Sequence, residues 1–107
     1  MGHDLPALLQ RIRSQLDARG ADPAKPLLTE MEHTLTDGYA RALELEGERL
    51  RIERRIGELA HRLDGPEEAK ELRGLAMQLR AVDEDLAGLR DVLADLQQHV
   101  DAARAAA

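Results

Sequence analysis

Two Glu-x-x-His pairs are the residues of this chain whose types and spacing come nearest to known chemistry. Glu30 and His33 form the first pair, and Glu58 and His61 form the second. On a helix this spacing places a carboxylate and an imidazole on one face, as in di-iron carboxylate bundles. Both pairs are expected to point away from the core, about 42 Å apart along one helix. We interpret them as solvated surface residues, with a metal-binding carboxylate and histidine bundle as an alternative that needs a partner chain.

Arg49 is a charged residue at a position that the hydrophobic pattern assigns to a helix core, opposite Val82. Four carboxylates are expected beside that layer: Glu46, Glu48, Asp83 and Asp85. Such a polar layer fixes the register and the oligomeric state of packed helices at some cost in stability. We expect Arg49 to reach outward and pair with one or two of these acids. A site for a divalent cation or a basic partner is the alternative.

A second irregularity in the core pattern is Gly38, which is expected to leave a gap opposite Leu93. The ring of Tyr39, the only aromatic side chain, or a residue from outside would fill that gap, or the helix would bend there. Tyr39 and two leucines lie off the core on an adjoining face of the same helix. We expect a second copy of the chain to cover them, with the N-terminal helix as the alternative. With the core arginine they make the candidate interaction residues: Tyr39, Leu43, Leu50 and Arg49.

Basic residues concentrate in one segment and alternate with glutamates, as in intrahelical salt bridges. They are Arg49, Arg51, Arg54, Arg55, His61 and Arg62. The layout of a short helix, a loop and a long hairpin resembles the N-terminal tRNA-binding arm of bacterial seryl-tRNA synthetases, and residues 16–23 are similar to the loop region of that arm. That resemblance implies an RNA-binding helical arm, which we keep as an alternative function. The net charge of −6 does not favour nucleic acid as a partner.

The acidic residues Asp64, Glu67 and Glu68 resemble the hairpin tip of transcript-cleavage factors, where tip carboxylates hold magnesium. We interpret them instead as helix-capping acids, because carboxylates stabilise the positive end of a helix. No nucleophile motif, glycine-rich phosphate loop or Cys/His cluster occurs in the sequence. We therefore expect a protein that is not an enzyme and carries no cofactor.

The elements that must position these residues follow from two mirrored sets of ten positions, spaced three and four residues apart. The first set is Leu28, Met31, Leu35, Gly38, Ala42, Leu45, Arg49, Ile52, Ile56 and Leu59. The second set is Leu72, Leu75, Leu79, Val82, Leu86, Leu89, Leu93, Leu96, Val100 and Ala103. Counting outward from the middle, each position pairs with one in the other set, and the mirror point lies between Gly65 and Pro66. We call these twenty positions the seam; they predict two helices packed antiparallel.

We predict an all-α fold: a short helix over about 5–18, a Pro- and Gly-containing loop over 20–26, and helices over about 27–63 and 66–103. The two long helices would form an antiparallel hairpin of coiled-coil type, within a single helical domain over 1–107. Gly65 suits the left-handed position that closes a helix, and Pro66 suits the first turn of the next. Because a two-helix core is thin, we expect a four-helix bundle on dimerisation.

The predicted function is that of a non-enzymatic coiled-coil interaction or scaffold protein that forms a homodimer, with an unidentified protein as a further partner. The 107 residues include no cysteine and no stretch apolar enough to cross a membrane. With no signal peptide apparent, we expect a cytoplasmic protein. Arginine outnumbering lysine, with abundant alanine and glycine, is typical of GC-rich bacterial genomes. Neither the partner nor the direction of the dimer follows from the sequence.

Overall fold

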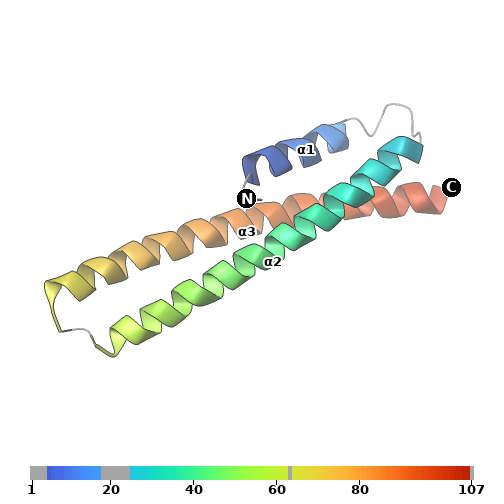
Figure 1. The fold of residues 1–107 in the computed structure, drawn as a ribbon. Helices are drawn as coiled ribbons and strands as arrows, with labels where there is room; N and C mark the ends of the chain where they lie inside the picture. The colour runs from blue at the N-terminus through green and yellow to red at the C-terminus, as the bar shows by residue number, and fades with distance from the viewer. Residues whose placement is uncertain (1–4, 18–24, 63, 107) are drawn as a thin grey trace. The chain divides into compact units, whose positions relative to one another are not determined.

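The computed structural model describes residues 5–17, 25–62 and 64–106, and all of its regular elements are helices. They are α1 (Leu5–Asp17), α2 (Lys25–Ala60) and α3 (Pro66–Ala106), as Figure 1 shows. The prediction of an all-α chain, with a short N-terminal helix before a helical hairpin, is confirmed. The dimeric bundle stays a prediction, and so does the single domain over 1–107.

The helices contribute to two compact units, which we describe separately. The first unit contains α1, the part of α2 up to Ala42 and the part of α3 from Gly88 onward. The second unit spans Leu43–Ala87 and therefore contains the end of α2, the turn and the start of α3.

The start of α2 differs from the prediction, which placed residues 25 and 26 in a loop. The helix begins at Lys25 and includes Pro26 in its first turn. Proline is tolerated there, because the first backbone N–H groups of a helix have no partner within it and a fixed φ near −65° suits the helix. The rest of the predicted loop, residues 20–24, lies outside the described residues.

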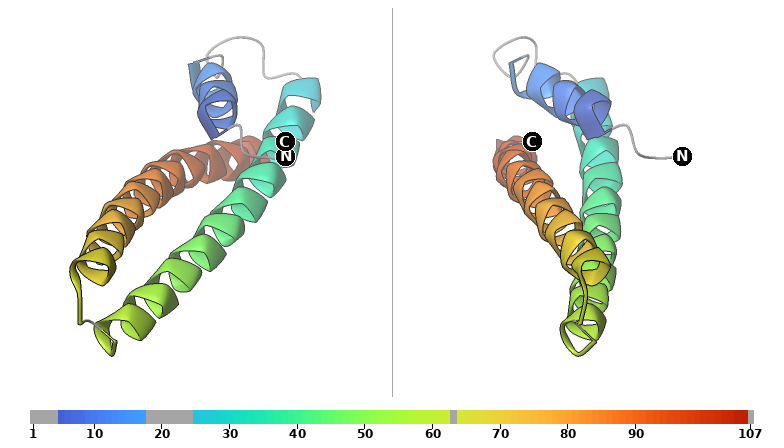
Figure 2. Two further views of the ribbon diagram at one scale, coloured as in Figure 1. Left: turned by 60° about the vertical axis from the view of Figure 1, so that its left-hand side comes forward. Right: turned by 90° about the vertical axis from the view of Figure 1, so that its left-hand side faces the viewer.

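The turn between the long helices corrects the role predicted for Gly65. α2 ends at Ala60 rather than near 63, and Arg62 N donates to the carbonyl oxygen of Leu59 at 3.0 Å in a tightened last turn. Gly65 has no positive φ, so the left-handed closure is wrong. Its carbonyl oxygen instead accepts the Ala69 N–H at 3.2 Å, the first bond of α3, which makes Gly65 the N-cap. The two views of Figure 2 show this connection at the tip of the second unit.

α1 packs on α2 in the first unit through two polar contacts and a buried apolar stripe. Gln15 Nε2 donates to Thr34 Oγ1 at 2.9 Å, and Arg11 pairs with Asp37 at 2.6 Å. Thr34 is buried and donates in turn to the carbonyl oxygen of Glu30. Ile12 of α1 is fully buried. These contacts fix which face of α2 the short helix covers, a position that the sequence did not determine.

The seam is packed to different depths in the two units. None of its twenty positions is exposed, so the predicted periodicity holds throughout. In the first unit eight of the ten seam positions are buried, whereas in the second unit only four are: Leu45, Leu59, Val82 and Leu86. The difference has a simple cause, because the first unit contains parts of three helices and the second contains parts of only two. The seam of the second unit is therefore partly accessible to solvent.

The predicted gap at Gly38 is absent, because Leu93 fills the space. A Cβ atom placed on Gly38 would lie 2.3 Å from Leu93 Cδ2, closer than carbon atoms can approach. Leu93 itself is almost fully buried. Because Gly38 has no side chain, Leu93 of α3 can approach α2 closely at this position. No cavity is left that Tyr39 or an outside residue would have to fill.

Candidate functional site

Arg49 lies at its predicted seam position in the second unit, and its guanidinium forms ion pairs with one acid of each long helix. Its Nε donates to Asp83 Oδ1 at 2.6 Å, and its Nη2 lies 3.7 Å from Glu53 Oε2. The hydrogen bond to Asp83 raises the pKa of Arg49, and the negative charges of Asp83 and Glu53 act in the same direction. Arg49 is therefore charged at neutral pH and joins α2 to α3 at this layer.

The structure brings only part of the predicted polar layer to Arg49. Of the four acids, Asp83 binds it directly, Glu46 and Asp85 are exposed, and Glu48 is half-buried. Glu53 was not expected in this layer but was among the glutamates that alternate with the arginines, and it lies four residues from Arg49, the spacing of a helical ion pair. The arrangement is a cross-helix clamp with one strong partner rather than a ring of four carboxylates.

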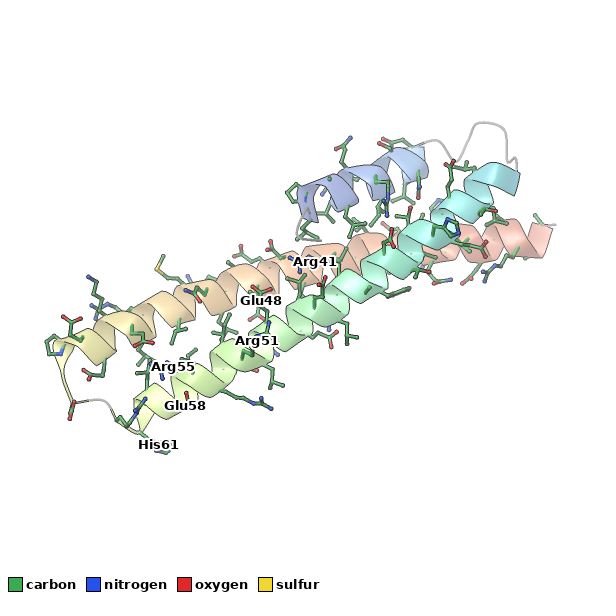
Figure 3. The ribbon with its side chains drawn as sticks, in the orientation of Figure 1. Arg41, Glu48, Arg51, Arg55, Glu58 and His61 are labelled. Atoms are coloured by element: carbon green, nitrogen blue, oxygen red, sulfur yellow. The ribbon has the colours of Figure 1, made fainter. Side chains whose placement is uncertain are left out.

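A second cross-helix ion pair, absent from the sequence prediction, lies nearer the turn. Arg55 Nε donates to Glu71 Oε2 at 3.0 Å, and Arg55 also lies 3.5 Å from Glu58 on its own helix. The hydrogen bond to Glu71 raises the pKa of Arg55. Figure 3 shows Arg55 and Glu58 on the last turns of α2. Both residues flank the seam, but the mirror relation sets residue 55 opposite Ala76 and residue 71 opposite Ala60, so the sequence pattern did not point to this pair.

The other three candidate interaction residues, one in the first unit and two in the second, are exposed. Tyr39, in the first unit, is 49% exposed, and its hydroxyl donates to Gln97 Oε1 of α3 at 3.2 Å. In the second unit, Leu43 is 69% and Leu50 is 47% exposed. Tyr39 shares its unit with α1 and still stands exposed, so for Tyr39 the alternative that α1 covers it is wrong. A fourth exposed apolar residue, Met77, was not singled out from the sequence, although it stands off the seam of α3.

The two Glu-x-x-His pairs are exposed on α2 and in the turn that follows it. Figure 3 labels the second pair, Glu58 and His61. Over the ranges 5–17, 25–62 and 64–106, no three His, Asp or Glu side chains come together in a way that would hold a metal ion. Metal binding by this chain therefore stays the alternative predicted from the sequence, and the described residues do not form a site for it.

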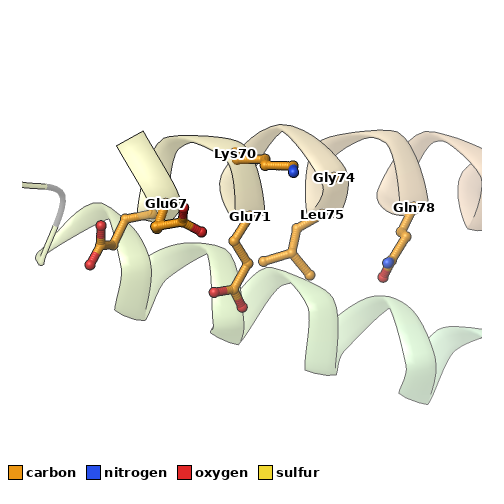
Figure 4. Close-up of a pocket in the computed structure, with 7 residues that line it drawn as sticks. Glu67, Lys70, Glu71, Gly74, Leu75 and Gln78 are labelled. Atoms are coloured by element: carbon orange, nitrogen blue, oxygen red, sulfur yellow. The ribbon is translucent and has the colours of Figure 1, made fainter. Parts of the chain in front are cut away.

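A surface pocket of about 540 Å³ lies on the first three turns of α3. Its lining is Glu67, Glu68, Lys70, Glu71, Gly74, Leu75 and Gln78. In Figure 4 Glu71, Leu75 and Gln78 point toward α2, whereas Lys70 points away from it. Because the Glu71 carboxylate is already held by Arg55, the pocket does not present a convergent set of polar groups for a small ligand.

The chain was also compared with known proteins. No family model matches it, and neither a curated protein nor a solved structure does. The likeness of its layout to the seryl-tRNA synthetase arm and to the cleavage-factor tip therefore stays a resemblance. In the part of the chain that the structure describes, no helix is long and apolar enough to cross a membrane. The geometry of the second unit carries the functional argument.

Replacing Arg49 by leucine tests the clamp. Because Arg49 sits in a half-buried seam layer between apolar residues, Arg49→Leu is expected to raise the unfolding midpoint. It should also broaden the range of assemblies, since the polar residue that restricts packing is gone. Chemical denaturation followed by circular dichroism, with the mass in solution from light scattering, measures both effects. A lower midpoint with an unchanged assembly would contradict this role of Arg49.

Proposed function

We propose that this chain is a non-enzymatic helical interaction protein that self-associates through its second unit. The observation that carries the proposal is the exposure of Leu43 and Leu50 on α2, beside a seam of which six of ten positions are only half-buried. Burying a leucine side chain stabilises by about 1.5–3 kcal/mol. A second hairpin covering this face would supply the burial that α1 supplies in the first unit.

Two features favour an interaction role over catalysis. Two arginines of the second unit pair across the helices, Arg49 with Asp83 and Arg55 with Glu71. They therefore serve to hold two helices together rather than to meet a reacting group. The exposed leucines, in contrast, have no such internal role, and burial of apolar surface is the main favourable term in most protein association.

The proposal predicts that the double variant Leu43→Glu/Leu50→Glu loses self-association while keeping its helices. Each carboxylate would be buried without a partner in the complex, so the dissociation constant should rise at least about ten-fold. Light scattering over a concentration series measures the mass, and far-ultraviolet circular dichroism measures the helix content. Wild-type chain is expected to reach the mass of a dimer.

Met77→Glu is the matched control, because Met77 is equally apolar and exposed in the same unit. It stands two residues from both Leu75 and Leu79 and therefore on the far side of α3 from the seam. Its substitution should leave the mass unchanged. A wild-type chain that stays monomeric at every concentration would end the proposal, and so would a double variant as dimeric as wild type. Assembly that is indifferent to chelators argues against the metal alternative, and no shift of RNA at low salt argues against the RNA-binding one.

A further inference from the structure

The exposed leucines of α2 belong to a stripe that also contains a glycine. Leu43, Gly47 and Leu50 are separated by four and three residues, so they share one face of the helix. The only atom within 4 Å of a Cβ placed on Gly47 is Arg51 Nη1, at 3.5 Å, apart from the helix's own backbone. The helix surface between the two leucines is therefore low, and the flexible side chain of Arg51 is the group that lies over it.

Charges of opposite sign stand beside the two ends of this stripe. Glu44 follows Leu43 and Arg51 follows Leu50, and both charged residues are exposed. The seven-residue spacing between Glu44 and Arg51 puts them on one side of the stripe, about 10 Å apart along the helix axis. Figure 3 shows Arg51 midway along the second unit's part of α2. The stripe thus has an acidic end and a basic end on the same flank.

We propose that a second copy of this chain docks on this stripe with its α2 antiparallel, the two-fold axis passing beside Gly47. This rests on the proposed self-association and gives it a direction and a register. In that arrangement Leu43 packs against Leu50 of the second copy, and the reverse pair forms by symmetry. The glycines at the centre let the two helices approach closely, as small residues do between packed helices.

The charges favour this direction over a parallel one. Antiparallel pairing brings Glu44 beside the second copy's Arg51 twice, once on each side of the axis. A parallel pair would set Glu44 near Glu46 and Arg51 near Glu53 of the other copy, because the opposite flanks of the stripe then meet. Repulsion at Glu44 then offsets attraction at Arg51, whereas both charges attract in the antiparallel pair, so the antiparallel direction is favoured.

Charge reversal tests the register through a prediction that only the antiparallel pair makes. Glu44→Arg and Arg51→Glu should each weaken self-association about ten-fold, because each creates two like-charge contacts. Mixed in equal amounts, the two variants should form a heterodimer in preference to either homodimer, since both contacts are then attractive. One chain carrying both changes should recover wild-type association.

The measurement is native mass spectrometry of the two variants, one of them uniformly labelled with ¹⁵N, with circular dichroism to show that each stays helical. A statistical mixture of labelled and unlabelled dimers would overturn the register while leaving self-association intact. A wild-type chain that never dimerises would overturn the proposed function as well. The two failures are therefore distinguishable.

Engineered cysteines give a second, independent readout, because the chain has no cysteine of its own. Leu43→Cys mixed with Leu50→Cys should form a mixed disulfide under mild oxidation, whereas each variant alone should not form one. Parallel docking would give the reverse result, with each variant cross-linking to itself, and would overturn the proposal. Met77→Cys, exposed on the far side of α3, is the control for random collision and should stay uncross-linked in either case.

Discussion

Leu96→Ala is expected to lower the free energy of unfolding by about 2–5 kcal/mol. Leu96 is fully buried in the first unit, where α1 adds a third helix to the seam of α2 and α3. Removing its side chain loses the transfer energy of the deleted methyl and methylene groups and leaves a cavity that three packed helices cannot close easily. Urea denaturation monitored by circular dichroism measures the loss.

Leu79→Ala is the control for this prediction, since the same atoms are removed from a seam position of the second unit. Leu79 is only half-buried there, so its loss should cost about 1 kcal/mol, and water can enter the space that is left. Equal losses at Leu79 and Leu96 would show that the two units pack their seams equally well, which would contradict the role given to α1.

The sequence predicted the helices well because the seam is a long and regular signal. Twenty positions at three- and four-residue spacing define a face that must be buried, and no seam position is exposed in the structure. The ends of the helices were less certain, because only a few local contacts decide them. Pro26 is compatible with either a loop or a first helical turn, and Gly65 suits both a helix end and an N-cap.

The contacts between side chains were harder to predict than the helices. Asp83 was expected near Arg49, but so were three other acids, and long side chains on one face reach several partners within a helical turn. Which acid pairs depends on small rotations of the two helices, which a repeating pattern leaves undetermined. Leu93 was predicted to lie opposite Gly38, but the pattern did not show that Leu93 would fill the space of the missing side chain. That depends on how closely the two helices approach each other.

The unequal burial of the two units connects the fold to its proposed role. Both units use the same seam, yet the N-terminal helix belongs to only one of them. Helices with partly exposed apolar faces gain stability from a neighbour, whether that neighbour is part of the same chain or a second copy. The second unit is therefore where an added partner stabilises most, and it is the unit in which Leu43 and Leu50 stand exposed.

The close approach of Leu93 to Gly38 predicts the second large effect, a cost of about 1–3 kcal/mol for Gly38→Ala from overpacking. Alanine normally stabilises a helix interior relative to glycine by about 1 kcal/mol, so the sign alone is informative. Gly88→Ala is the matched control, because Gly88 is exposed on α3 in the same unit with no atom within 4 Å of its added Cβ, apart from the helix's own backbone. It should raise the free energy of unfolding by up to about 1 kcal/mol.

A double-mutant cycle separates this steric conflict from a general loss of helix packing. Leu93→Ala alone should cost about 2–5 kcal/mol, because Leu93 is buried to 1% exposure and leaves a cavity. With Gly38→Ala in the same chain, the new methyl group no longer meets the leucine and fills part of that cavity. The double variant should therefore be more stable than the sum of the single losses implies, by about 1 kcal/mol or more. Strict additivity in urea denaturation would show that the two residues do not touch, and a stabilising Gly38→Ala would show that the helices stand further apart than the structure places them.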